Sequence, residues 1–200
     1  MLDTVSRRDS EETRSRILEA TWNLLSSADS AVRMADVAKA AGVSRQAVYL
    51  HYPSRAELLI ATTRHIDEVE DVAGQLNAVF ANADGRSQLR AFVLAWGNYI
   101  PIVQGGAKRL MAIRDVDPDA AAAWEDRMTG LYNAARAVVE TLHRDGELAE
   151  DLSVDEAADL LWATVSVPTW EALTVSRGMT QDRYLEVTLR SLTRQLVDGR

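Results

Sequence analysis

The chain has 200 residues, 47% of them hydrophobic, which is enough for one or two compact domains with apolar cores. It has no cysteine, which excludes disulfides and thiolate metal sites, and no apolar run long enough to span a membrane. Its first residues are charged and unlike a signal peptide, so we expect a cytoplasmic protein with no membrane partner.

The net charge of −8 is unevenly distributed. Residues 1–66 hold nine Lys or Arg and eight Asp or Glu, whereas residues 67–200 hold thirteen and twenty-two. The acidity therefore belongs to the C-terminal two thirds. A nucleic-acid partner for the N-terminal third is not excluded, but it requires basic side chains to gather on one face.

No segment alternates with period two for long enough to predict a strand, so we predict an all-α fold of about nine helices. The first is expected over about 10–27. The second, over 34–41, ends at Gly42, and Ser44 then N-caps a short third helix. The fourth begins at the capping box Ser54–Glu57 and is predicted to continue to about residue 81.

Five further helices are predicted in the rest of the chain. One begins near residue 86 and should end or kink at Pro101, and a short one covers 107–113. The next begins at Asp117-Pro118 and ends near residue 145. A capping box at Ser153 begins a helix that should bend at Pro168, and the last helix covers about 181–197. We expect residues 1–53 to form one domain and residues 54–200 a second, linked by the fourth helix.

The short third helix has an unusual outer face. Its inner side carries Val48. The residues left on or near the outside are Arg45, Gln46, Tyr49, Leu50 and His51. A solvated helix has no need of outward Tyr and Leu side chains, whereas a helix lying in a DNA major groove does. The pattern over 34–58 indicates a DNA-binding helix-turn-helix.

The runs DVAKAAGVS (36–44) and YLHYPSRAEL (49–58) resemble the DNA-binding signature of TetR-type (tetracycline-repressor-like) transcriptional regulators. The detailed resemblance covers the first third of the chain, and the remainder agrees in length and helical pattern. It implies a homodimeric repressor that binds double-stranded DNA at an inverted-repeat operator and is released by a small-molecule effector.

The resemblance also implies roles for individual residues. Gln46 and Arg45 are the candidates for base edges, and Arg55 matches a family Lys that contacts phosphate. Three further residues match positions that reach phosphate or brace the helix: Tyr49, His51 and Tyr52. Two positions depart from the family pattern, since Arg33 stands where Thr or Ser is usual and Ala47 where a small hydroxyl is frequent. The full predicted DNA-binding set is Arg33, Ser44, Arg45, Gln46, Tyr49, His51, Tyr52 and Arg55.

Aromatic and Met side chains of the C-terminal part are candidates for a cavity that binds an apolar or aromatic effector. Trp and Met at helical spacing also suit a packed core, and this alternative stays open. The set is Trp96, Tyr99, Met111, Trp124, Met128, Tyr132, Trp162 and Trp170. The last two helices are predicted to pair in the dimer through Leu161, Val165, Leu185, Leu189 and Leu192.

Catalytic and metal-binding motifs are missing from the sequence. The three histidines are scattered, there is no HExxH, nucleophile elbow or P-loop, and Asp115-x-Asp117-x-Asp119 lacks the remainder of a calcium loop. We expect no enzyme activity, no metal and no cofactor. The alternative to a regulator is a helical small-molecule carrier with a vestigial helix-turn-helix, and a third reading is an enzyme on a helical scaffold.

Overall fold

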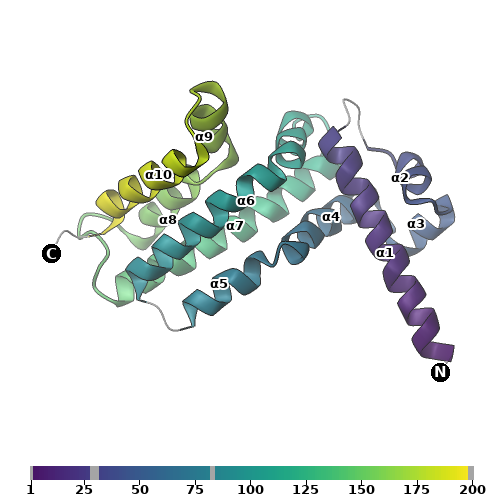
Figure 1. Cartoon of the computed structure of the whole chain (residues 1–200), viewed down its shortest axis with the longest axis horizontal. Helices are drawn as coiled ribbons and strands as arrows, with labels where there is room; N and C mark the ends of the chain where they lie inside the picture. Colours follow the sequence, from purple (N-terminus) through teal and green to yellow (C-terminus); the bar gives the residue numbers. More distant parts are fainter. Residues whose placement is uncertain (1, 28–31, 82–83, 198–200) are drawn as a thin grey trace. The chain divides into compact units, whose positions relative to one another are not determined.

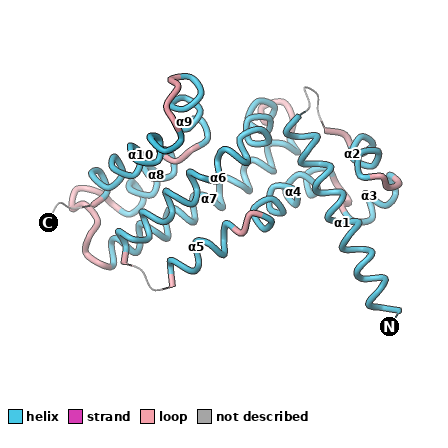
Figure 2. Tube along the Cα trace, viewed as in Figure 1, coloured by secondary structure: helices cyan, strands magenta, loops and turns pink. Residues whose placement is uncertain are grey.

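The computed structural model describes residues 2–27, 32–81 and 84–197 (Figure 1). These residues form ten α-helices and one π-helix, with no β-strand beyond a single bridge between Leu148 and Val197 (Figure 2). The all-α prediction is confirmed. The elements are α1 Leu2–Ser27, α2 Met34–Ala41, α3 Arg45–His51, α4 Arg55–Val69, α5 Val72–Phe80, α6 Gly85–Ile113, α7 Pro118–Arg144, α8 Val154–Thr164, α9 Val167–Glu171, η1 Ala172–Ser176 and α10 Gln181–Leu196.

The single helix predicted over 54–81 is wrong, because the chain breaks between α4 and α5. Asp71 adopts the left-handed conformation with φ of 47°. Asp tolerates this conformation better than most residues, and it ends the regular α-helical path. Neither glycine nor proline marks the break, so apolar spacing alone did not reveal it.

Two breaks expected elsewhere fall differently. α6 runs unbroken through Pro101 and through Gly105-Gly106. Gly106 is required inside this helix by packing, because a Cβ there would lie 2.4 Å from a ring atom of Trp22. Pro168 lies in the first turn of α9, where a missing N–H costs no helical hydrogen bond, and Ser166 N-caps that helix. The predicted bend is therefore a full break.

The contacts divide the chain into two compact units, here called unit 1 and unit 2. Unit 1 comprises residues 1–69 and 105–127, and unit 2 comprises residues 70–104 and 128–200. This division differs from the expected boundary at residue 54. All of α4, the end of α6 and the start of α7 belong with the N-terminal helices.

Unit 1 is built on a core in which α1 packs against α2 and α4. Ile17, Val37 and Leu59 are fully buried in it. The turn after α2 depends on Gly42, whose φ of 66° strains any residue with a Cβ. Arg16 of α1 donates from Nη2 to the carbonyl oxygen of Ala41, which satisfies a free carbonyl at the end of α2. The helix-turn-helix is thus fixed to α1.

Unit 2 has its own core, in which α6, α7, α8 and α10 contribute large buried side chains. Phe92, Leu142 and Leu192 are buried there. At Gly97, α6 approaches α10 so closely that a Cβ would lie 2.4 Å from Cδ2 of Leu185. The capping box predicted at Ser153 is present at the start of α8.

Candidate nucleic-acid interface

α3 presents an exposed face with mixed chemistry. Ser44 caps the helix by accepting a hydrogen bond from the backbone N–H of Ala47 at 3.0 Å, and Val48 anchors the inner side in the core. Arg45 and Gln46 are exposed. Tyr49 is 46% exposed and Leu50 82% exposed. A rigid helix that displays guanidinium, amide, phenol and isobutyl groups together offers the contacts that base edges and thymine methyl groups require.

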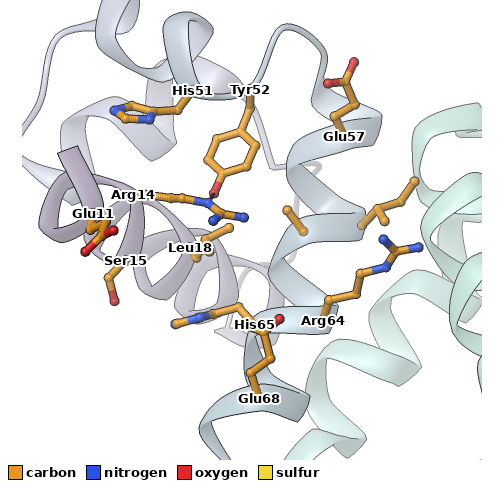
Figure 3. A pocket seen from close by; sticks show the side chains of 12 residues that line it. Glu11, Arg14, Ser15, Leu18, His51, Tyr52, Glu57, Arg64, His65 and Glu68 are labelled. Atoms are coloured by element: carbon orange, nitrogen blue, oxygen red, sulfur yellow. Dashed lines mark hydrogen bonds between the residues drawn. The ribbon is translucent and has the colours of Figure 1, made fainter. Parts of the chain in front are cut away.

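Tyr52 does not project from this surface. It is 4% exposed, and its hydroxyl accepts a hydrogen bond from Nε of Arg14 at 3.1 Å (Figure 3). Burial raises the pKa of the Tyr52 phenol and outweighs the opposing effect of Arg14. Of its two expected roles, phosphate contact or bracing, the structure favours bracing, because Tyr52 holds the end of α3 against α1.

Arg55 also differs from its expected role. Its Nη1 donates to Asp117 at 2.8 Å and to Asp119 at 3.2 Å, and its Nε donates to the carbonyl oxygen of Val32. Nε and Nη1 are therefore occupied within the protein, and Nη2 is buried with no hydrogen-bond partner among the described residues. This arrangement does not favour the phosphate contact that the family resemblance implies for Arg55.

The remaining members of the predicted DNA-binding set lie at the surface or near it. Arg33 is exposed and precedes α2, where its side chain makes no cap hydrogen bond. His51 is half-buried at the end of α3, beside the ring of Tyr52. Arg33 is thus placed to reach a ligand outside the protein, in place of the usual Ser or Thr.

A cavity of about 530 Å³ lies in unit 1 between α1, the end of α3 and α4 (Figure 3), and the sequence did not predict it. His65 contributes to the lining, and its Nε2 is buried with no hydrogen-bond partner among the described residues. The lining is Glu11, Arg14, Ser15, Leu18, His51, Tyr52, Glu57, Ile60, Ala61, Arg64, His65 and Glu68. This charged lining differs from the apolar and aromatic effector cavity that was expected.

Three of the predicted effector-binding aromatics occupy packed core positions in unit 2. Nε1 of Trp96 donates to the carbonyl oxygen of Val165 at 2.8 Å, and Tyr99 packs edge-on against Trp96. Nε1 of Trp170 donates to Oε1 of Gln181 at 2.9 Å. All three rings are buried, so the structure favours the alternative of a packed core for Trp96, Tyr99 and Trp170.

The other five members are half-buried and divide between the units. Met111 and Trp124 belong to unit 1, and Met128, Tyr132 and Trp162 to unit 2. Trp124 lies beneath the guanidinium of Arg114 at 5.6 Å, a cation–π contact. Neither unit brings all eight residues together in one cavity.

The predicted dimer residues are mostly core residues of the single chain. Leu161, Val165 and Leu192 are fully or almost fully buried, which contradicts an interface role for these three. Helical spacing predicts an apolar face but does not distinguish a core from an interface. Leu185 and Leu189, with Leu94, instead line a groove of about 460 Å³ whose other lining residues are Arg90, Asp182, Glu186 and Arg190.

Among the residues that the structure describes, no helix is long and apolar enough to cross a membrane. No group of three or more His, Cys, Asp or Glu in the same part of the chain is arranged to hold a metal ion. Asp117 and Asp119, singled out in the sequence, serve α7 and Arg55 instead.

Comparison with known proteins agrees with this geometry. Residues 17–62 match the family model described as bacterial regulatory proteins, tetR family. The HTH-type transcriptional repressor LfrR of Mycolicibacterium smegmatis is 28% identical over 192 residues, which cover 94% of this chain and 92% of LfrR.

Two solved structures share the fold. A TetR-family transcriptional regulator from Rhodococcus sp. superposes with a TM-score of 0.75 at 19% identity, over 92% of this chain and 98% of that one. A transcriptional regulator from Saccharomonospora viridis in complex with choline has a TM-score of 0.73 at 22% identity, over 94% and 99%.

Proposed function

Because the chain belongs to the TetR family of bacterial transcriptional regulators, we propose that it is a repressor that binds an inverted-repeat operator as a homodimer and releases it when a small molecule binds. The observation that carries the proposal is the exposed face of α3. Tyr49 and Leu50 project there with no protein core to cover them. DNA is the partner that fits a two-turn helix with this face.

Sequence preference is assigned to the first turn of α3. The Gln46 amide pairs in a two-pronged way with adenine, and the Arg45 guanidinium with guanine. Arg33 reaches phosphate from the start of α2, which sets orientation and salt dependence without selecting bases. Tyr52 and Arg55 contribute indirectly, by holding the helices.

In the proposed dimer, the second protomer binds the second half-site of the operator. Two recognition helices related by a two-fold axis meet successive major grooves about 34–36 Å apart or somewhat more, which requires an inverted repeat. The surface for pairing is proposed on α8 and α10. Leu160 of α8 is 39% exposed, next to the buried Leu161, and Leu189 of α10 lies in the unit 2 groove.

An effector is proposed to bind in unit 2. The S. viridis relative was solved with choline, which supports a small-molecule ligand for this fold. Trp162 of α8 offers a half-buried indole whose Nε1 is buried with no hydrogen-bond partner among the described residues. A ligand acceptor at this N–H would satisfy a donor that is otherwise costly to bury.

Selection of bound DNA from a random pool tests the proposal. We expect the selection to enrich an inverted repeat, and the retention of the protein on this DNA to weaken steeply with salt. Light scattering should give the mass of a dimer. A carrier with a vestigial helix-turn-helix would instead show no enriched sequence while still binding small molecules. A wild-type protein that is monomeric at micromolar concentration would contradict the dimer.

A further inference from the structure

Four arginine–aspartate ion pairs connect α4 to Asp117 and the first part of α7, and all lie within unit 1. Arg55 pairs with Asp117 and Asp119, Arg64 with Asp126, and Arg127 of α7 with Asp67 of α4. The partners are 60 to 64 residues apart in sequence at every contact. A nearly constant separation means that the two segments run parallel and in register, so the contacts form an ion-pair ladder.

The rungs differ in exposure. Both side chains of the Arg55–Asp117 pair are 17% exposed, whereas Arg64 is 64% exposed. Exposed ion pairs contribute little, but removing one partner of a shielded pair leaves a charge without compensation. Arg55 is therefore the rung whose loss matters most, and Arg64 provides a matched exposed control.

Arg55 joins three segments at one point. Its Nε donates to the carbonyl oxygen of Val32, two residues before α2, while its backbone begins α4. Its Nη1 reaches the start of α7, where Oδ1 of Asp117 also accepts from the backbone N–H of Asp119 and of Ala120, each at 3.2 Å. The residue thus connects the helix-turn-helix to the α6–α7 turn.

The pair is charged at neutral pH. Burial lowers the pKa of Arg55, but the hydrogen bonds with Asp117 and Asp119 outweigh it and raise the pKa overall. The hydrogen bond from Arg55 holds the pKa of Asp117 below its usual range.

We propose that Arg55 is a positioning residue, which acts with Asp117 as a clamp that fixes α2 and α3 relative to the start of α7 in the arrangement that binds DNA. The inference rests on the proposed function. In this clamp, Arg55 contacts the protein and not DNA. The α6–α7 turn then influences operator affinity through Asp117.

The test compares Arg55→Gln, Asp117→Asn and the double variant in titrations of the selected operator at several salt concentrations. Asn keeps an N-cap acceptor oxygen, so Asp117→Asn removes the negative charge while the cap of α7 can be retained. Each single variant should weaken binding by a similar factor, roughly 2- to 30-fold, the range expected for residues that act on a site through intervening structure. The double variant should be no weaker than either, with the salt slope unchanged, and Arg64→Gln should bind as wild type does.

A direct phosphate contact by Arg55 gives a different pattern. Arg55→Gln would then lower the salt slope by about one, and Asp117→Asn would leave affinity unchanged or raise it, because a carboxylate near the DNA is lost. That pattern overturns the clamp.

Hydrogen exchange of the α2 and α3 amides, measured without DNA, keeps the inference separate from the proposed function. In both single variants, the α2 and α3 amides should exchange faster than in the wild type. The increase should be at least as large as the increase for the α1 amides. Unchanged exchange in Asp117→Asn refutes the clamp, even for a protein that binds no operator. A wild type that binds no DNA, but whose variants show the faster exchange, refutes the proposed function and leaves the clamp standing as a structural one.

Discussion

Leu161→Ala should destabilise the fold of the single chain without acting on the dimer surface. Leu161 is fully buried in α8, so the substitution removes apolar contacts and leaves a cavity in unit 2. Such a change costs about 3 kcal/mol, within the roughly 2–5 kcal/mol found for buried Leu→Ala. For a chain of this length, about 2–4 °C is lost per kcal/mol, so we expect the melting temperature to fall by about 6–12 °C.

The matched control is Leu160→Ala, one residue earlier in the same helix. Leu160 is 39% exposed, so in a separate protomer its truncation should change the free energy of unfolding by no more than about 0.5 kcal/mol. If Leu160 lies in the dimer surface, its effect should instead grow as the protein is diluted.

Thermal unfolding by circular dichroism at several protein concentrations, with light scattering in parallel, distinguishes these effects. Leu161→Ala should lower the melting temperature by a similar amount at every concentration. A Leu161→Ala protein that keeps its wild-type melting temperature but dissociates into monomers would refute the burial argument and restore the interface assignment.

Two further predictions concern packing and charge in unit 1 and in α7. Gly106→Ala should be destabilising, because its Cβ would meet the ring of Trp22, whereas Gly130→Ala meets no atom within 4 Å and should stabilise α7 by about 1 kcal/mol, both measured by urea unfolding. The lowered pKa of Asp117 contributes stability that is present above its unfolded-state value of 3.8 and is lost as pH falls through the folded value. In Asp117→Asn, the free energy of unfolding should therefore fall less steeply below about pH 4 than in the wild type. An identical pH dependence in the two proteins would contradict the ion pair with Arg55.

Features set by neighbouring residues were predictable from the sequence. The turn at Gly42, the cap at Ser44, and the capping box at Ser153 follow from backbone conformation and side-chain hydrogen bonds that span only a few residues. Gly178, two residues after the end of η1, has a positive φ of 70°, a conformation that glycine adopts without strain. Local chemistry therefore accounts for these particular helix boundaries.

Features set by distant partners were not predictable in this way. No residue near Arg55 in the sequence indicates that a carboxylate 62 residues away will pair with it. The family resemblance therefore predicted a phosphate contact for Arg55, whereas the structure pairs it with Asp117. Leu160 and Leu161 are chemically identical, and only the packing of α8 separates an exposed side chain from a buried one. The conformation of Asp71 likewise has no marker in the residue type.

DNA selection carried out in parallel with wild type and Gln46→Ala tests the central claim most directly, since it asks whether the exposed face of α3 reads base sequence. We predict an inverted repeat for the wild type, and for the variant a changed base preference at one symmetric pair of positions, with the rest of the site retained. Identical enriched sequences from both proteins, or no two-fold symmetry in either, would contradict the account.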